Sequence, residues 1–185
     1  MRSAAAPRVL LVGMMAAGKT SLGRALSDAT GWPYLDNDEL VERATGRPTP
    51  EVLAGGDEAT LRAAEAAALD EALAAEPPVI AGVAGGVVTD PELRRRLAAE
   101  GFVVYLRAPV ELLVERVGRG SDRPWLQGDP AAALQRLFEG REERYVEVAD
   151  LVLDVADVPL DELVGRVLDA LDHSSGRAPD PRTDD

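Results

Sequence analysis

Short apolar runs alternate with amphipathic segments along most of the chain. The first run, residues 8–12, ends at Gly13 and is typical of a buried strand. In residues 19–29 the apolar side chains recur three and four positions apart, which predicts a helix that ends before Gly31. Further strands are predicted over residues 33–35, 79–81, 102–106 and 151–153. Further helices are predicted over residues 40–44, 57–75, 90–99, 110–117, 130–148 and 160–171.

Five strands separated by helices predict one parallel sheet that is covered on both faces. The predicted fold class is therefore α/β, a three-layer α/β/α domain whose ligands bind at the carboxyl ends of the strands. A single domain is expected over residues 7–172, with disordered tails at residues 1–6 and 173–185. Residues 48–56 carry two prolines and paired glycines, so a loop is predicted there.

The charge balance argues against several classes of function. The chain has 185 residues, with 20 basic and 33 acidic side chains and a formal net charge of -13. Such a chain has no general attraction for nucleic acid or anionic lipid, so an anionic ligand must meet a local cluster of positive charge. Because the chain has no cysteine and one histidine, His173, any metal would be held by oxygen. No apolar stretch approaches the ~20 residues of a membrane span, and we expect a cytoplasmic monomer that binds neither nucleic acid nor membranes.

Residues 13–20 read Gly-Met-Met-Ala-Ala-Gly-Lys-Thr and match the phosphate-binding pattern G-x-x-x-x-G-K-S/T. The segment lies between a predicted strand and a predicted helix, where backbone N–H groups and the helix N-terminus cradle phosphates. Lys19 is the only lysine of the chain, and its compact ammonium on a flexible stem suits contact with β- and γ-phosphates. The loop therefore predicts binding of ATP, with Mg²⁺ held in part by the Thr20 hydroxyl. The residues expected to bind the nucleotide are Gly13, Ala16, Ala17, Gly18, Lys19, Thr20 and Ser21.

Two acidic residues follow the second predicted strand. The strand at residues 79–81 runs into Gly82, so the aspartate that often ends a strand beside such a loop is missing. Asp36 is the better candidate for a second Mg²⁺ ligand, because Mg²⁺ prefers oxygen ligands and a nearby carboxylate. Asp38 is a candidate to accept a proton from a substrate hydroxyl or to orient it, and its alternative role is to cap the helix that contains Leu40. Together these residues indicate a phosphoryl transferase with a small acceptor.

Several further motifs accompany the loop. They are D-N-D at 36–38, T-G-R at 45–47, L-R-A-A-E at 61–65, A-G-G-V-V-T-D-P-E at 84–92, R-P-W-L at 123–126 and R-E-E-R-Y-V-E-V-A-D at 141–150. With the loop, they resemble the motifs of the shikimate kinase family over about residues 9–171. The resemblance implies a P-loop fold of the nucleoside-monophosphate-kinase kind. It also implies ATP-dependent phosphorylation of shikimate to shikimate 3-phosphate, a step toward aromatic amino acids.

The same resemblance implies roles for residues that bind the substrate. Arg62 and Arg141 would hold its carboxylate, and Asp38 would contact its ring hydroxyls. Planar guanidinium groups suit a carboxylate and supply the local positive charge that the whole chain lacks. Gly85 and Gly86 would let the backbone approach the ligand. For each arginine, the alternative is an ordinary ion pair on a helix surface.

A lid is implied over about residues 118–129, and a substrate-binding segment over about residues 37–65. Arg123 in the lid would contact the nucleotide and stabilise charge on the transferring phosphoryl group, and Arg119 is a weaker candidate for this role. The expected catalytic residues are Lys19, Asp38 and Arg123.

Some positions depart from the family pattern. Ala84 stands in place of the first glycine of a triplet, where a methyl group can narrow the pocket. Ser121, Trp125 and the pair Glu143–Arg144 differ in or after the lid. Two alternatives therefore stay open: a kinase of the same family for another small polyol acid or cyclitol, such as gluconate, and a non-catalytic ATP-binding module.

Overall fold

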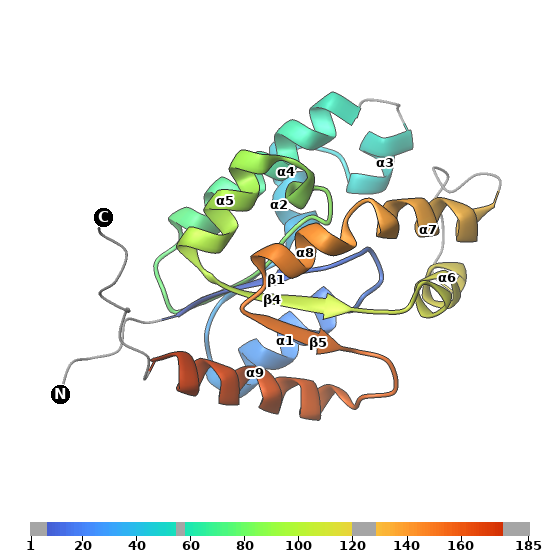
Figure 1. Cartoon of the computed structure of the whole chain (residues 1–185). Coiled ribbons are helices and arrows are strands. Elements are labelled where there is room, and N and C mark those ends of the chain that lie inside the picture. Colours follow the sequence, from blue (N-terminus) through green and yellow to red (C-terminus); the bar gives the residue numbers. More distant parts are fainter. Residues whose placement is uncertain (1–6, 55–57, 120–128, 176–185) are drawn as a thin grey trace, which may run out of the picture.

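A computed structural model describes residues 7–54, 58–119 and 129–175 of the chain. Within these ranges, five parallel strands form one sheet in the order β2-β3-β1-β4-β5 (Figure 1). The strands are β1 (Arg8–Val12), β2 (Tyr34–Leu35), β3 (Val79–Gly82), β4 (Phe102–Arg107) and β5 (Leu151–Asp154). In the middle of the sheet, Leu10 of β1 pairs with Ala81 on one side and with Val103 on the other.

Helices cover both faces of this sheet. Helices α1 and α9 lie on one face, and α4, α5 and α8 lie on the other (Figure 1). The helices are α1 (Lys19–Thr30), α2 (Asn37–Thr45), α3 (Thr49–Ala54), α4 (Glu58–Ala74), η1 (Val87–Thr89), α5 (Pro91–Glu100), α6 (Val110–Arg119), α7 (Pro130–Glu139), α8 (Glu142–Val148) and α9 (Leu160–Ser175). The prediction of a parallel, three-layer α/β/α fold is confirmed.

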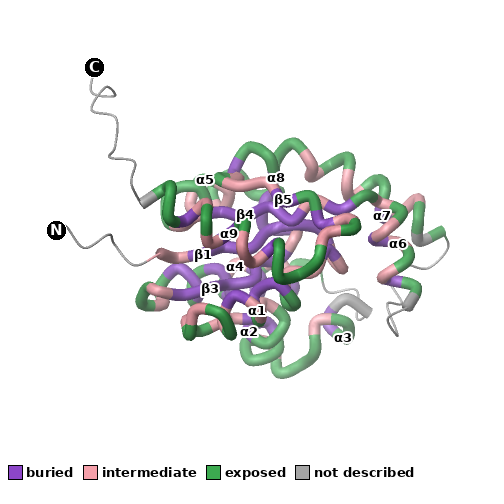
Figure 2. The backbone as a smooth tube through the Cα atoms, turned by 90° about the horizontal axis from the view of Figure 1, so that it is seen from below, coloured by how far each residue is buried: buried purple, intermediate pink, exposed green. Residues whose placement is uncertain are grey.

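The core follows from the apolar runs of the central strands. Leu10, Leu11, Ile80 and Val104 are all fully buried between the helical layers, and Figure 2 shows the strands as the buried centre of the molecule. Because parallel strands in a layered fold are covered on both faces, they carry continuous rather than alternating apolar residues. Among the described residues, no helix has both the length and the apolar character needed to cross a membrane.

The prediction of one helix over residues 130–148 is wrong, because the chain breaks at Gly140 and Arg141. The N–H of Gly140 donates to the carbonyls of Arg136 and Phe138, which closes α7. Arg141 takes φ −128° and ψ −21°, outside the helical region, and α8 starts after it. The apolar pattern continues on both sides of the break, so periodicity alone does not reveal it. The break places Arg141 at the start of α8 rather than inside a long helix.

The prediction of a loop over residues 48–56 is also wrong in part, because α3 lies within it. The backbone N–H groups of Glu51 and Val52 donate to the carbonyl of Pro48 at 2.9 and 3.2 Å. Pro48 and Pro50 stand where the helix begins, and the first N–H groups of a helix have no partner inside it. The prolines therefore start this helix instead of preventing it.

The described elements begin with β1 and end with α9. The first strand begins at Arg8, as expected, but α9 continues to Ser175, beyond the expected end at Asp172. Residues 1–6 and 176–185, where tails were expected, lie outside the described residues.

Candidate active site

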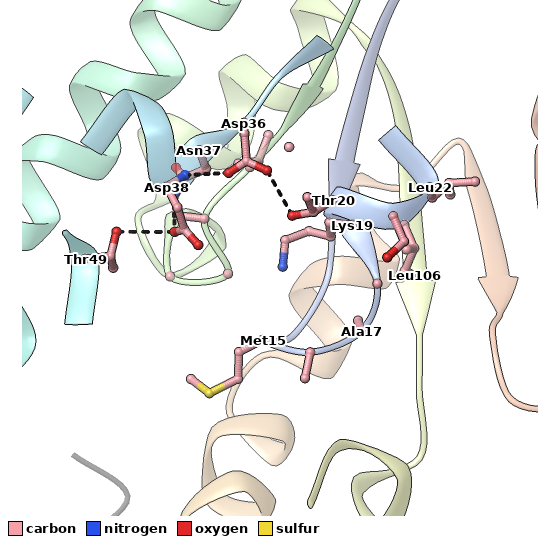
Figure 3. Close-up of a pocket in the computed structure, with 18 of the residues that line it drawn as sticks. Met15, Ala17, Lys19, Thr20, Leu22, Asp36, Asn37, Asp38, Thr49 and Leu106 are labelled. Carbon is pink, nitrogen blue, oxygen red and sulfur yellow. Dashed lines mark hydrogen bonds between the residues drawn. The ribbon is translucent and has the colours of Figure 1, made fainter. Parts of the chain in front are cut away.

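The phosphate-binding loop connects β1 to α1 at the carboxyl edge of the sheet. Gly18 has a φ of +104°, a conformation that side chains with a Cβ rarely adopt, and it directly precedes the first residue of α1. The Lys19 Nζ donates hydrogen bonds to the carbonyls of Gly13 and Met14 at 2.9 and 3.0 Å. Figure 3 shows Lys19 pointing into the cavity beside Thr20. The loop therefore presents an ammonium group and a helix N-terminus to one space.

That space is a single cavity of about 1000 Å³. Most of the site residues predicted from the sequence line it, namely Ala16, Ala17, Gly18, Lys19, Thr20, Ser21, Asp36, Asp38, Arg62, Gly85, Gly86 and Arg141. Gly13 is not among the lining residues, and its carbonyl accepts a hydrogen bond from Lys19. Arg123 lies outside the described residues, and so does the side chain of Arg119.

Asp36 is held at three points where β2 ends. Its Oδ2 accepts hydrogen bonds from the hydroxyls of Thr20 at 2.9 Å and Tyr34 at 3.1 Å. Its Oδ1 accepts the N–H of Asp38 at 2.9 Å and so caps α2. Gly82 stands where other phosphate-binding folds often carry an aspartate. Its missing side chain makes room for Tyr34, because a Cβ at Gly82 would lie 2.8 Å from the tyrosine hydroxyl. Burial and the charge of Asp36 raise the pKa of Tyr34, which therefore remains a hydrogen-bond donor.

Thr20 and Asp36 are the residues that fit a Mg²⁺ ion. They place one hydroxyl and one carboxylate 2.9 Å apart beside the phosphate-binding loop. Mg²⁺ is typically held by one or two protein oxygens, substrate phosphates and water, so this donor set suits it. Among the described residues, no group of three or more histidines, cysteines or carboxylates could by itself hold a metal ion.

Asp38 does not cap α2, because Asp36 does. The alternative role that the sequence allowed for Asp38 is therefore wrong. Its exposed carboxylate lines the cavity, and Oδ1 accepts hydrogen bonds from Thr49 at 3.3 Å and Asn37 at 3.4 Å (Figure 3). Both bonds fall on the same oxygen, which leaves Oδ2 to face a ligand hydroxyl. Thr49 was not singled out in the sequence, although it lies in the expected substrate-binding segment at residues 37–65.

Arg62 forms the ion pairs of a helix surface and also lines the cavity. It contacts Glu65 at 2.6 Å and Glu58 at 3.4 Å, both on α4. Glu65 is buried, and this burial raises the pKa of its carboxyl although the charge of Arg62 opposes the shift. A Cβ at Gly86 would overlap Nη1 of Arg62, so only glycine allows the loop to pass so close to the guanidinium. An ion pair on α4 and a role in ligand binding are therefore compatible for Arg62, because its partner Glu65 holds the guanidinium at the cavity wall.

Arg141 and Arg62 both lie beside the segment that contains Gly85 and Gly86, which we call the glycine loop. A Cβ at Gly85 would lie 3.5 Å from Nη1 of Arg141, while Gly86 meets Arg62. The two guanidinium groups therefore flank one pair of glycines and form a local positive cluster in an acidic chain. Such a pair of cationic forks is suited to an acceptor that carries a carboxylate.

Arg116 on α6 was missed in the sequence. Its Nη1 donates to the carbonyls of Ala16 and Ala17 at 3.1 and 3.3 Å, and the residue lines the cavity. Ala16 has a φ of +61°, which is strained for a residue with a Cβ, and Arg116 holds the loop at this point. In the sequence, Arg116 is only one of the polar residues of an amphipathic helix, and no motif connects it with the phosphate-binding loop.

The fold and the cavity together define a P-loop phosphotransferase of the nucleoside-monophosphate-kinase kind. The model of the shikimate kinase family matches residues 15–172. A shikimate kinase of Halorhodospira halophila is 39% identical over 165 residues, which cover 89% of this chain and 93% of that protein. The chain therefore belongs to the shikimate kinase family, as the motifs indicated.

Solved structures agree with this assignment. A shikimate kinase from Acinetobacter baumannii in complex with shikimate matches with a TM-score of 0.85 and 32% identity, over 93% of this chain and 96% of that one. A gluconokinase from Sinorhizobium meliloti matches with a TM-score of 0.64 and 23% identity, over 91% of this chain and 93% of that one. The second likeness shows the fold alone.

Proposed function

We propose that this protein transfers the γ-phosphoryl group of ATP to a hydroxyl of shikimate and forms shikimate 3-phosphate. The observation that carries this proposal is the shared cavity, which joins the phosphate-binding loop to Asp38 and to the arginine pair Arg62 and Arg141. A phosphoryl donor at one end and a hydroxylated carboxylic acid at the other would meet within it. The family membership and the relative solved with shikimate support the same substrate.

At the donor end, Lys19 would contact the β- and γ-phosphates, and the backbone of the loop would surround them. Thr20 and Asp36 would hold Mg²⁺, which supplies positive charge to the phosphate oxygens when it is bound. The hydrogen bonds of Asp36 support this role, because three of them already orient its carboxylate.

At the acceptor end, Arg62 and Arg141 would bind the carboxylate and so place a ring hydroxyl beside Asp38. The hydroxyl oxygen forms the new bond to the γ-phosphorus, the bond from that phosphorus to ADP breaks, and the hydroxyl proton passes toward Asp38. Catalysis would therefore consist of positioning and electrostatic stabilisation, with no covalent enzyme intermediate. Arg123 would add charge from the lid at residues 118–129, and the substrate-binding segment would span residues 37–65.

A different acceptor in the same site is the second candidate. Ala84 is buried and lines the cavity, so its methyl group changes the shape of the acceptor end. Another small polyol acid, such as gluconate, would use the same arginines and the same donor end. A non-catalytic role is less well supported, because Lys19, Asp36 and Asp38 all face the cavity.

Release of ADP by the purified protein tests these possibilities. The assay contains ATP and Mg²⁺ and compares shikimate, quinate, gluconate and no acceptor. Turnover that requires shikimate is the expected result. Turnover with gluconate or quinate alone would show that the acceptor is not shikimate. ATP binding without turnover would show that the protein is a non-catalytic binding module.

We also propose that the protein is a cytoplasmic monomer of one domain over residues 7–172. The reaction consumes ATP, which the cytoplasm supplies, and residues of one chain line both the donor end and the acceptor end of the cavity. Light scattering coupled to size exclusion tests the oligomeric state, for which a mass of 19.6 kDa is expected.

A further inference from the structure

Tyr145 on α8 lies behind the wall of the proposed acceptor site. Its side chain is fully buried, and its hydroxyl donates a 2.8 Å hydrogen bond to the carbonyl of Gly85. Gly85 lines the cavity, whereas Tyr145 is not among the residues that line it. Any effect of Tyr145 on a ligand must therefore pass through its neighbours.

The hydrogen bond acts on a peptide unit that has unusual freedom to rotate. Gly85 and Gly86 both lack a Cβ, so the peptide unit between them can adopt either orientation at small cost. In a trans peptide the C=O and the N–H point in opposite directions. Holding the Gly85 carbonyl on Tyr145 therefore directs the Gly86 N–H away from Tyr145. One hydroxyl thus selects the orientation of the loop.

The Arg141 guanidinium lies beside the same hydroxyl, and its charge opposes the rise that burial causes in the pKa of Tyr145. Because its single proton is donated to Gly85, the Tyr145 oxygen presents its lone pairs to this positive charge. The two residues are one helical turn apart, and the backbone N–H of Tyr145 donates to the Arg141 carbonyl at 2.9 Å. A Cβ at Gly85 would lie 2.9 Å from the Tyr145 hydroxyl and 3.5 Å from Nη1 of Arg141. The side chains of Arg141 and Tyr145 therefore meet the glycine loop at Gly85.

The tyrosine ring is itself held in place. Tyr105 of β4 stacks on it, with ring centroids 4.9 Å apart and an interplanar angle of 19°. The Tyr105 hydroxyl donates its proton to the carboxylate of Glu142 and not to the carbonyl of Gly85. Burial raises the pKa of Tyr145 to about 12, so its hydroxyl stays protonated at neutral pH. The ring therefore offers a fixed donor to Gly85.

We propose that Tyr145 is a positioning residue for the acceptor, which aligns the Arg141 guanidinium with the Gly85–Gly86 peptide. The inference rests on the proposed function, in which these two groups meet the carboxylate and the ring of the acceptor. Tyr145 acts through them and touches neither ATP nor the acceptor, and its other hydroxyl contact, with Sδ of Met14 at 3.9 Å, is long and weak. Its loss should therefore weaken binding of the acceptor and leave the donor end unchanged.

Tyr145→Phe keeps the stacked ring and removes the hydroxyl. The matched control is Tyr105→Phe, which makes the same deletion on the other ring of the stack. For Y145F we expect the KM for shikimate to rise about 10-fold, which corresponds to about 1.4 kcal/mol and is the size of one buried hydrogen bond. The KM for ATP should stay within about twofold of the wild type, and Y105F should leave both constants unchanged. Thermal melting of both variants checks that the fold persists.

Hydrogen–deuterium exchange supplies a readout that needs no acceptor. The peptide that covers residues 83–89 should exchange faster in Y145F than in the wild type and in Y105F. A shikimate KM within twofold of the wild type, or an equal rise for shikimate and ATP, would overturn the inference, as would unchanged exchange in the glycine loop. Absence of any shikimate turnover in the wild type would instead refute the proposed function, and the exchange experiment would still decide whether Tyr145 positions the loop.

Discussion

The hydroxyl of Thr20 donates a 2.9 Å hydrogen bond to Oδ2 of Asp36, while Oδ1 of the same carboxylate caps α2. The bond connects the first turn of α1 to the start of α2. One carboxylate therefore fixes the entry of a helix and faces the phosphate-binding loop. These two roles can be separated by mutation, because only one of them requires a negative charge.

Asp36→Asn keeps the cap, since asparagine and aspartate are about equal at the N-cap. It removes the charge that would hold Mg²⁺. We expect kcat/KM to fall about 100-fold, on the order of 3 kcal/mol, with a higher Mg²⁺ concentration needed for half-maximal rate. Titration of the rate with Mg²⁺ measures both quantities, and the melting temperature should change little.

Asp70→Asn is the control for this experiment. Asp70 forms an exposed ion pair with Arg96 at 2.5 Å, far along the chain from the loop. Its variant should have the Mg²⁺ dependence of the wild type. If Asp36→Asn also had that dependence, Asp36 would not be a ligand of the ion.

Gly86→Ala tests the close approach of the loop to Arg62. The new Cβ would overlap Nη1 of Arg62, and the guanidinium is the part that can move. We expect the KM for shikimate to rise about 10-fold because the carboxylate partner is displaced, with the KM for ATP unchanged. Steady-state kinetics with each substrate varied in turn measures the KM for shikimate and the KM for ATP separately.

Gly165→Ala is the matched control. Gly165 lies in α9, and a Cβ there meets nothing within 4 Å. Alanine in a helix is favoured over glycine by about 0.5–1 kcal/mol, so this variant should be more stable and kinetically normal. A normal shikimate KM in Gly86→Ala would show that Arg62 does not bind the acceptor.

Glu65 predicts a pH dependence of stability. Burial raises the pKa of its carboxyl above the ordinary value, so the fold favours the protonated form. This contribution to the free energy of unfolding is present below the unfolded pKa and is lost as the pH rises through the folded pKa. Glu65→Gln should therefore gain stability relative to the wild type as the pH is raised from about 4 to about 7. Denaturant unfolding at the two pH values measures the difference.

The same variant should be a poorer enzyme at neutral pH. Glutamine cannot supply the charge that holds Arg62 at 2.6 Å, so the KM for shikimate should rise while stability improves. A relative stability that falls with rising pH would mean that pairing with Arg62 outweighs the burial of Glu65.

Lys19 offers a chemical test, because it is the only lysine of the chain. Apart from the N-terminal amine, it is the one site for an amine acetylating reagent. We expect activity to be lost in proportion to acetylation of Lys19, since the modification removes its charge. Peptide mass spectrometry quantifies the modification, and ATP with Mg²⁺ should slow it. Full activity of protein acetylated at Lys19 would exclude the lysine from catalysis.

The sequence predicted the elements whose residues are defined by local pattern. The strand ending at Val12 and the helix beginning at Lys19 appear as expected, because an apolar run, the phosphate-binding motif and helical periodicity are all local signals. The family motifs likewise placed Asp38, Arg62 and Arg141 around one cavity.

Residues that act through contacts across the fold could not be predicted in this way. Tyr34 reaches Asp36 only because Gly82 of a neighbouring strand leaves space for it. Arg116 and Tyr145 contact loops that are distant in sequence, at Ala16 and at Gly85. Such pairs have no fixed spacing, and the break before α8, which brings Arg141 to the cavity, interrupts a pattern that appears continuous.

Analysis of the reaction product tests the central claim most directly. Purified protein is incubated with ATP, Mg²⁺ and shikimate, and the mixture is examined by mass spectrometry and ³¹P NMR. We predict one phosphate ester on the 3-hydroxyl of shikimate for each ADP released. Release of ADP without phosphorylated shikimate, or phosphorylation of gluconate or quinate in its place, would contradict the account.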